Sequence, residues 1–343
     1  MKGVILHGGH GTRLRPLTHT GPKQLLPIAN KPMSEYCLEA IRDSKITDIA
    51  IIIGGVGNEK VREYYGNGEK FGVNITYIEQ DKPRGIAHAI KLCRDFIHNE
   101  KFLVFLGDNI IQKPILDLKE NFEKSNFDAT VLLCEVENPS RFGIADMKDS
   151  KISKIIEKPK YPPTNFAVTG IYFLTPKIFE IINELKPSWR NEYEITDALQ
   201  LLLEKNDNIS YEMITDYWKD TGTPEDIINA NTQILKNISE DVLKKEDSTV
   251  IDPESSIIMP SIVGKNCHIG KGVKIGPNAS IGDNTIISSN VSIKNSIIMS
   301  YCKIEGGLKI NNSIISGNCH LQGNNKDNSE KLFLLGEGTR ISL

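Results

Sequence analysis

Apolar and polar stretches alternate along the first 238 residues in the way that successive strands and helices produce. Continuous apolar runs, such as "DIAIIIGG" at 48–55 and "KFLVFLGDN" at 101–109, are typical of strands covered on both faces. Residues 85–97 instead place apolar side chains at helical spacing. The alternation predicts an α/β domain over residues 1–238, in which helices wrap a mostly parallel sheet.

The rhythm changes in the middle of this domain, where strand-like runs follow one another with little helix between them. They predict an antiparallel extension over the sheet, with strands near 129–137, 143–147, 151–159 and 166–175. Helical patterns return at 176–185 and 194–205. The segment "PEDIINANTQILKNI" at 224–238 predicts the last helix of the domain, with a proline in its first turn.

An apolar residue recurs at every sixth position from residue 257 onward. The positions are Ile257, Val263, Ile269, Ile275, Ile281, Ile287, Ile293 and Met299, and glycine follows at 264, 270, 276 and 282. One inward apolar side chain per face of a triangular coil, with glycine in the turn, predicts a hexapeptide-repeat parallel β-helix. The regular run accounts for about two to three coils, and the period falters after Ser300. We therefore expect a linker over 239–254 and a β-helix over 255–343 with an irregular C-terminal cap.

Composition narrows the class of protein. The chain has 343 residues and a formal net charge of −3, which argues against general binding to nucleic acids or anionic membranes. The six cysteines are scattered without a CxxC pair, so reduced, mostly structural thiols are expected in place of a zinc site or a disulfide framework. No apolar run approaches the roughly 20 residues of a membrane span. These features predict a cytoplasmic protein.

The opening stretch "LHGGHGTRLRPLTHTGPKQLLPI", residues 6–28, is locally basic in a slightly acidic chain. No acidic residue precedes Glu35, and Gly8, Gly9 and Gly11 follow the first strand. Glycine lets backbone N–H groups approach an anion closely, so this stretch predicts a phosphate-binding turn. The pattern differs from the dinucleotide G-x-G-x-x-G, because Leu14 occupies the last glycine position, and it lacks the G-K-[ST] of a P-loop. The alternative is a tight turn with solvated cations.

The motif "LHGGHGTRLRPLT…PKQLLPIANKP" resembles the signature of the sugar-1-phosphate nucleotidyltransferases. Further matching segments follow in order: "QDKPRGIAHAI", "FLGDN", "PSRFGIA", "IIEKP", "FAVTGIYFLTP", "NEYEITDAL" and "YWKDTGTPEDIINAN". With the β-helix tail, the chain is most similar to the long form of the glucose-1-phosphate thymidylyltransferases (dTDP-glucose pyrophosphorylases). The resemblance implies a Rossmann-like catalytic domain of the nucleotide-diphospho-sugar transferase type, followed by a left-handed parallel β-helix.

The resemblance also implies the reaction. A hexose 1-phosphate, most simply glucose 1-phosphate, attacks the α-phosphate of a pyrimidine nucleoside triphosphate such as dTTP, with Mg²⁺ bound, and pyrophosphate leaves. A UTP-dependent glucose-1-phosphate or N-acetylglucosamine-1-phosphate uridylyltransferase is the alternative enzyme, and a non-catalytic sugar-nucleotide-binding regulatory homologue is the alternative without turnover. A β-helix acyltransferase would need a longer coil stack and a catalytic histidine; the tail is expected instead to make contacts in a homo-oligomer.

Site residues follow from the resemblance, position by position. The implied catalytic residues are Arg13, Lys23, Asp108, Lys158 and Asp220, of which Asp108 and Asp220 would bind Mg²⁺. The implied nucleotide-binding residues are Leu6, Gly8, Gly9, Gly11, Thr12, Arg13, Gln24, Gln80, Gly85 and Asp108, with Gln80 and Gly85 facing the pyrimidine. The implied sugar-phosphate residues are Gly143, Glu157, Lys158, Val168, Gly170 and Glu194. Taken alone, Asp108 and Asp220 would be turn residues, and Glu157 with Lys158 would be a solvated pair.

One position departs from the family pattern. His7 stands where the family usually has a small residue, beside the expected nucleobase, and His10 occupies the variable slot of the glycine loop. Two histidines that titrate near neutral pH would make triphosphate binding sensitive to pH. The alternative is that His7 packs against the base or a neighbouring strand while His10 is solvated. Either way, His7 leaves the choice between dTTP and UTP open.

Overall fold

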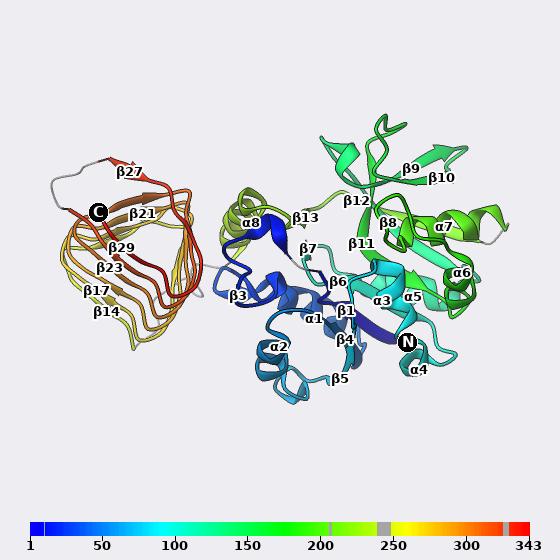
Figure 1. Cartoon of the computed structure of the whole chain (residues 1–343), viewed down its shortest axis with the longest axis horizontal. Coiled ribbons are helices and arrows are strands. Elements are labelled where there is room, and N and C mark those ends of the chain that lie inside the picture. Colours follow the sequence, from blue (N-terminus) through cyan, green and yellow to red (C-terminus); the bar gives the residue numbers. More distant parts are fainter. Residues whose placement is uncertain (10, 206–207, 239–247, 325–328) are drawn as a thin grey trace. The chain divides into compact units, whose positions relative to one another are not determined.

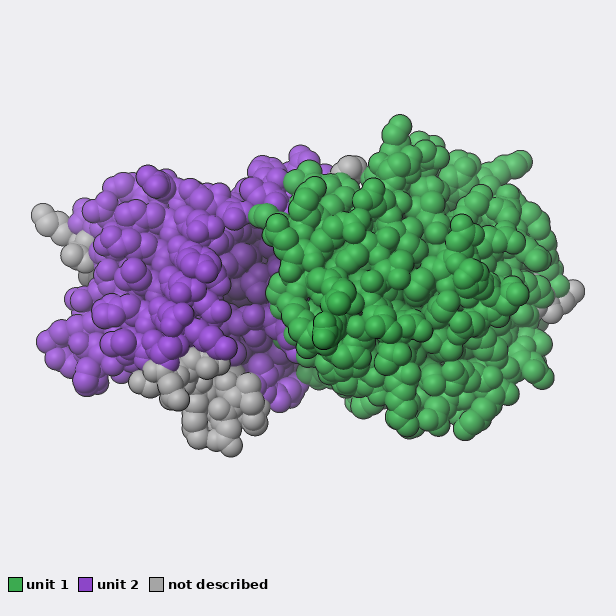
Figure 2. Space-filling view, turned by 90° about the horizontal axis from the view of Figure 1, so that it is seen from below, with its two compact units in different colours: residues 1–10, 34–220 green, residues 11–33, 221–343 purple. Residues whose placement is uncertain are grey.

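The computed structural model describes residues 1–343 except residues 10, 206–207, 239–247 and 325–328 (Figure 1). The chain divides into two compact units, unit 1 with residues 1–10 and 34–220 and unit 2 with residues 11–33 and 221–343 (Figure 2). The basic segment 11–33 therefore groups with the β-helix, which the hydrophobic pattern did not indicate.

Unit 1 is built on a mixed sheet of nine strands in the order β10-β9-β11-β6-β1-β4-β5, with β8 paired to β11 and β12 paired to β8. β1 pairs in parallel with β4 and β6, as the buried apolar runs predicted. The strands are β1 (Lys2–Leu6), β4 (Asp48–Ile53), β5 (Asn74–Glu79), β6 (Phe102–Leu106), β8 (Ala129–Glu135), β9 (Gly143–Lys148), β10 (Lys151–Glu157), β11 (Phe166–Leu174) and β12 (Ile209–Ile214).

The middle strands pair antiparallel, as predicted, but they continue the sheet itself and do not lie over it. β11 pairs antiparallel with β6 inside the same sheet, and β9 and β10 continue that sheet toward its edge. The reason is visible in the burial of β11, where every residue from Ala167 to Leu174 is buried. A strand apolar on both faces fits the interior of a sheet covered on both sides. β12, which the pattern did not predict, pairs in parallel with β8.

Helices pack on this sheet around one apolar cluster that includes Val4, Ala50, Ile90, Val104 and Leu199. The helix predicted over 85–97 is divided into α3 and α4, because the amide of Cys93 bonds to the carbonyl of Ile90 in a tighter turn. The helices are α1 (Met33–Asp43), α2 (Asn58–Tyr65), α3 (Ile86–Lys91), α4 (Arg94–Ile97), α5 (Leu116–Lys124), α6 (Ile178–Glu184) and α7 (Ile195–Glu204), with 3₁₀ turns η3 (Glu69–Phe71) and η4 (Pro139–Arg141).

Unit 2 contains three stacked sheets of parallel strands, consistent with the left-handed parallel β-helix expected from the resemblance (Figure 1). One sheet has six strands and the other two have five each. The first sheet comprises β14 (Val250–Ile251), β17 (His268–Ile269), β20 (Ile286–Ile287), β23 (Lys303–Glu305), β26 (His320–Gln322) and β29 (Arg340–Ser342). The second sheet comprises β15 (Ser256–Ile257), β18 (Lys274–Ile275), β21 (Ser292–Lys294), β24 (Lys309–Asn311) and β27 (Glu330–Lys331). The third sheet comprises β16 (Ser261–Val263), β19 (Ala279–Ile281), β22 (Ile297–Ile298), β25 (Ile314–Ile315) and β28 (Leu334–Leu335).

The coils of the β-helix extend beyond the regular six-residue run. Val263 pairs with Ile281, 18 residues on, but Ile281 pairs with Ile298, only 17 residues on. The inward residue is therefore Ile298 and not Met299, and a strict count of six loses register there. The coils nevertheless continue to β29, so much of the segment expected to be an irregular C-terminal cap forms further coils. Of the predicted linker 239–254, residues 239–247 lie outside the described residues, and β14 already pairs with β17.

All six cysteines are free thiols, and five of them are buried, in agreement with the expected structural role. Cys93 belongs to the core of unit 1, whereas Cys267, Cys302 and Cys319 point into the β-helix. Among the described residues, no helix combines the length and the apolar character needed to cross a bilayer.

The third sheet of the β-helix carries an apolar outer face that is covered within unit 2. Val263, Ile281, Ile298 and Ile315 point inward, so their neighbours in each strand point outward. Two of those neighbours, Ile297 and Ile314, are nevertheless buried. The segments that bond to this sheet come from α8 (Pro224–Asn237) and from residues 11–33, which form η1 (Thr12–Leu14), η2 (Lys23–Leu25), β2 (Pro27–Ile28) and β3 (Lys31–Pro32).

Asn231, in the middle of α8, joins the basic segment to the β-helix. Its carboxamide oxygen accepts hydrogen bonds from the amide of Ala29, at 2.8 Å, and from the hydroxyl of Ser280, at 2.7 Å. The side chain of Asn30 donates to the carbonyl of Ile281 at 2.6 Å. Ala29 and Asn30 form the β2–β3 turn with φ of 49° and 62°, a conformation that costs roughly 1–2 kcal/mol for a residue such as alanine. The buried bonds of Asn231 and Asn30 offset this cost.

We predict that Asn231→Ala lowers the free energy of unfolding of unit 2 by about 1–3 kcal/mol, because it leaves the buried amide of Ala29 without its acceptor. Amide hydrogen exchange at Ala29 should accelerate with it. Asn237→Ala, at the exposed end of the same helix, is the matched control and should change neither quantity appreciably. Equal effects of the two substitutions would contradict the role of this bond.

Candidate active site

Carboxylates gather at the end of β6 in unit 1. Asp108 follows β6, and β13 (Trp218–Asp220) pairs antiparallel with β7 (Asn109–Ile111) so that Asp220 lies opposite Asn109. Burial raises the pKa of the Tyr172 hydroxyl far above its usual range, and four carboxylates raise it further, those of Glu157, Asp108, Asp220 and Glu194. Asp108 and Asp220 therefore lie on neighbouring segments after the carboxyl end of a parallel strand, where open α/β sheets bind ligands.

The donor set fits magnesium. Mg²⁺ prefers hard oxygen ligands and usually takes one or two carboxylates, with phosphate oxygens and water completing the shell. Asp108 and Asp220 are two such carboxylates on paired segments. The described residues hold no group of three or more His, Cys, Asp or Glu side chains that could hold a metal ion. That Asp108 and Asp220 bind Mg²⁺ stays a prediction.

Asn109 is a buried residue that organises this region and that the sequence analysis missed. It is only 2 % exposed. Its carboxamide oxygen accepts from the amide of Gly170 at 3.1 Å and from the indole Nε1 of Trp218 at 2.8 Å, and its nitrogen donates to Asp108 Oδ1 at 3.2 Å. A side chain at Gly170 would meet the Asn109 carboxamide at 2.8 Å. The only signal in the sequence was the asparagine that follows Asp108 in "FLGDN".

Glu157, on the expected sugar side, is held by three groups. The hydroxyl of Thr196 donates to Oε2 at 2.9 Å, while Lys158 Nζ and Arg190 Nη1 each lie 3.4 Å from Oε1. Gly143 lies beside it, because a Cβ there would collide with the Thr196 methyl group and come within 3.3 Å of Glu157 Oε2. The structure thus brings Gly143, Glu157 and Lys158 together, as predicted.

Glu194 is buried beside Glu157, and both carboxylates form ion pairs with Arg190. Ser188 donates to Glu194 Oε1 at 3.0 Å, and Arg190 does so at 3.2 Å. Burial raises the pKa of the Glu194 carboxyl, and the charge of Glu157 adds to the rise. Arg190 therefore neutralises a pair of acids, a role that sequence reasoning missed because Arg190 follows Trp189 in a loop with no periodic pattern.

Of the two residues expected to face the base, Gln80 lies beside Gly8. Gln80 is buried at the end of β5, and its Nε2 lies 3.0 Å from His88 Nδ1. A Cβ at Gly8 would stand 2.9 Å from Gln80 Oε1, so the bare backbone of the glycine turn approaches the Gln80 side chain. Gly85 has φ of 105°, and a side chain there would collide with the backbone of Tyr193. His88 was not anticipated, although it lies on the α3 face next to Gln80.

His7 is fully enclosed at the end of β1. It is 1 % exposed, its ring packs edge-on against Tyr65 at 5.9 Å, and neither ring nitrogen has a hydrogen-bond partner among the described residues. Burial lowers the pKa of His7 to about 3, although the charge of Asp108 opposes the shift. His7 therefore does not titrate near neutral pH, and that expectation was wrong; packing against a neighbour is the reading that holds. His10 lies outside the described residues.

The cations of the opening stretch belong to unit 2. Gly11 has φ of 57°, and its carbonyl accepts from the Thr18 hydroxyl at 2.8 Å. Thr12 and Arg13 in η1 are exposed, Lys23 in η2 is half-buried and Gln24 is buried. Since the carboxylates belong to unit 1, the approach of Arg13 and Lys23 to the same substrate stays a prediction.

Two family models match the chain. One, described as "Nucleotidyl transferase", matches residues 2–237, and one described as "GMPPB C-terminal domain" matches residues 257–342. The low-salt glycan biosynthesis nucleotidyltransferase Agl11 of Haloferax volcanii is 49 % identical over 253 residues, which are 74 % of this chain and 70 % of that protein. The glucose-1-phosphate thymidylyltransferase of Streptomyces antibioticus is 41 % identical over 271 residues, 78 % of this chain and 74 % of that protein.

A solved structure agrees with these matches. A Bacillus anthracis protein crystallised with sucrose superposes with a TM-score of 0.66 at 42 % identity, covering 70 % of this chain and 96 % of that one. This chain thus shares its fold with that structure over about 70 % of its length.

We predict that acid destabilises the protein through His7. The unfolded histidine takes up a proton below about pH 6.5, whereas folded His7 stays neutral down to about pH 3, so stability is lost as the pH falls through this window. Replacing His7 with leucine should remove up to about 1.4 kcal/mol per pH unit of this loss. Urea unfolding at pH 7 and pH 5 measures it, with the exposed His19→Leu as control. Equal acid sensitivity of wild type and His7→Leu would contradict the neutral, buried state.

Proposed function

Because the chain belongs to the nucleotidyl transferase family, we propose that it joins glucose 1-phosphate to the α-phosphate of dTTP and releases pyrophosphate. The observation that carries the proposal is the antiparallel pairing of β13 with β7, which places Asp220 opposite Asn109, the residue that follows Asp108. The Streptomyces relative, named a glucose-1-phosphate thymidylyltransferase, supports the choice of sugar and base.

Asp108 and Asp220 would hold Mg²⁺, which when bound neutralises charge on the triphosphate and on the departing pyrophosphate. Asn109 fixes the carboxylate of Asp108 through its own hydrogen bond and is fixed in turn by Trp218 and Gly170. Arg13 and Lys23 would bind the phosphates from the basic segment. Such a transfer needs in-line positioning and charge stabilisation and no protein nucleophile.

The sugar phosphate would bind at Glu157 and Lys158. Thr196 and Arg190 orient the Glu157 carboxylate, so its remaining acceptor capacity faces the sugar hydroxyls. The Lys158 ammonium group, half-exposed and 3.4 Å from Glu157 Oε1, would move to the sugar's phosphate. Glu194, Gly143, Val168 and Gly170 would complete the sugar wall.

The base would be read by Gln80. If its nitrogen donates to His88, its oxygen accepts from the N3–H group of the pyrimidine. Thymine and uracil share this edge and differ by the 5-methyl group, so a UTP-dependent uridylyltransferase acting on glucose 1-phosphate or N-acetylglucosamine 1-phosphate is the second candidate. A regulatory homologue without turnover is the third. A cytoplasmic homo-oligomer with β-helix contacts remains part of the proposal.

Release of pyrophosphate tests the proposal. The purified chain is combined with dTTP, UTP, CTP, ATP or GTP and with glucose, glucosamine or N-acetylglucosamine 1-phosphate, with and without Mg²⁺. We expect release with dTTP and glucose 1-phosphate that depends on Mg²⁺. Release with UTP alone would move the assignment to the uridylyltransferase, and no release with any pair from folded protein would refute the enzyme.

We predict that Asp220→Asn lowers kcat/KM by about 10²–10³-fold and raises the Mg²⁺ concentration needed for half-maximal rate, because a charged metal ligand becomes neutral. The matched control is Asp216→Asn, an exposed position on the same segment, which should leave both values unchanged. An unaltered Mg²⁺ dependence in Asp220→Asn would remove Asp220 from the metal site.

A further inference from the structure

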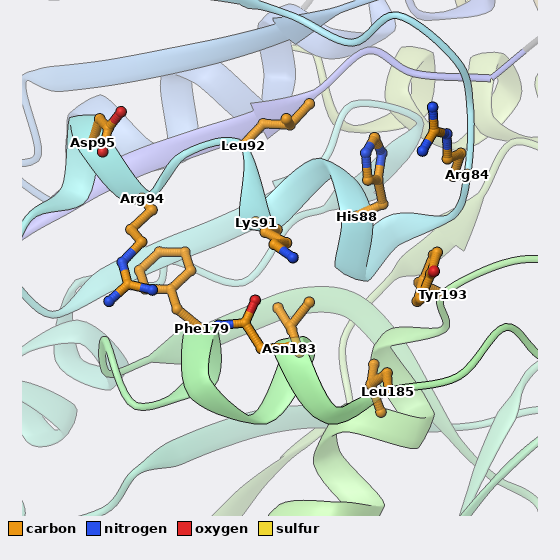
Figure 3. A pocket seen from close by; sticks show the side chains of 11 residues that line it. Arg84, His88, Lys91, Leu92, Arg94, Asp95, Phe179, Asn183, Leu185 and Tyr193 are labelled. Atoms are coloured by element: carbon orange, nitrogen blue, oxygen red, sulfur yellow. The ribbon is translucent and has the colours of Figure 1, made fainter.

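A hollow opens in unit 1 between α3, α4 and α6 (Figure 3). Its volume is about 520 Å³, within the range of small-molecule sites. None of its lining residues was predicted for substrate binding, and the carboxylates around Tyr172 do not line it. The hollow is therefore distinct from the predicted substrate-binding residues.

One wall of the hollow is basic. Arg84, His88, Lys91 and Arg94 line it, against the single acid Asp95. Arg84 is paired with Asp81 at 3.0 Å, whereas the described residues provide no carboxylate within ion-pair distance of Lys91 or Arg94. Burial lowers the pKa of the His88 imidazole, and the charges of Arg84 and Lys91 lower it further. A cavity with this excess of positive charge is suited to an anion.

The opposite wall is largely apolar. It is formed by Phe179, Ile182 and Leu185 of α6 and its end, together with Tyr193 (Figure 3). The guanidinium of Arg94 lies 6.0 Å from the centre of the Phe179 ring. A ligand that fills both walls carries its anion at Lys91 and Arg94 and an apolar or aromatic portion against Phe179 and Leu185.

The hollow is connected to the expected base-reading residues. His88, which lines it, lies 3.0 Å from the Gln80 amide. Tyr193 is also in the lining. Its backbone amide donates to the carbonyl of Arg84 at 2.7 Å, and its backbone carbonyl accepts from the amide of Ala87 at 3.0 Å. These bonds enclose Gly85, so a ligand that moves His88 or Tyr193 also moves the Gln80–Gly85 segment.

We propose that this hollow binds a small aromatic or apolar phosphate ester, and that its occupancy alters nucleoside triphosphate binding through His88 and Gln80. The phosphate bonds to Lys91 and Arg94, and the uncharged part packs on α6. The binding step is independent of the proposed function, whereas the coupling step rests on it.

Binding is tested with 4-nitrophenyl phosphate as the probe, by calorimetry on the full chain. We expect Lys91→Gln with Arg94→Gln to weaken binding at least tenfold, as two charge-assisted hydrogen bonds imply. The control removes two exposed cations elsewhere in unit 1, Lys124→Gln with Lys154→Gln, and should keep the affinity within about twofold. Leu185→Ser, on the opposite wall, should also weaken binding. Equal affinities in the two double variants would overturn the site.

Coupling is tested by the KM for dTTP and for glucose 1-phosphate, with and without the probe. We expect the probe to change the KM for dTTP at least twofold in the wild type and not in the Lys91→Gln, Arg94→Gln variant, with the KM for glucose 1-phosphate unchanged. Binding without a change in KM would overturn the coupling through Gln80. A chain that releases no pyrophosphate would refute the enzyme while the calorimetry still decides the site.

Discussion

Compensation of neighbouring carboxylates, of which Asp108 and Glu194 are buried, is the constraint on which the candidate site depends. Asp108, Asp220, Glu157 and Glu194 all act on the hydroxyl of Tyr172, and carboxylates brought so near one another need compensating charge or hydrogen bonds. Glu157 and Glu194 obtain this compensating charge within unit 1 from Arg190. Asp108 receives a hydrogen bond from Asn109, a neutral group. A bound divalent cation would add positive charge beside Asp108 and Asp220.

The sequence anticipated the parts of this site that are local. The strands that lead to Asp108 and to Gly8 are recognisable from their apolar runs. The order of the motifs pointed to Gln80, Glu157 and Asp220. What it could not reveal are partners brought in by tertiary contact. Arg190 lies in a loop without periodicity, and Asn109 acquires its role only when β13 pairs with β7. His88, on α3, joins the candidate site because its Nδ1 lies 3.0 Å from Gln80 Nε2.

The fold shows the same division between local pattern and long-range packing. The six-residue period identified the β-helix, but a coil shortened by one residue between Ile281 and Ile298 concealed the later coils. The placement of β11 inside the sheet follows from its burial on both faces, which periodicity alone does not reveal. Nothing in the linear sequence indicated that Asn231 and Ser280 would support the strained turn at Ala29, so the β-helix forms part of the scaffold of the basic segment.

The central claim is that Asp108 and Asp220 share one cation with the triphosphate. Crystals of the chain grown with Mn²⁺ and dTTP, measured at the manganese absorption edge, test it most directly. The account predicts one anomalous peak at coordination distance, about 2.0–2.3 Å, from oxygens of both aspartates and of the nucleotide, with Arg13 at the phosphates. A peak bound to the nucleotide alone, or to neither aspartate, would contradict it.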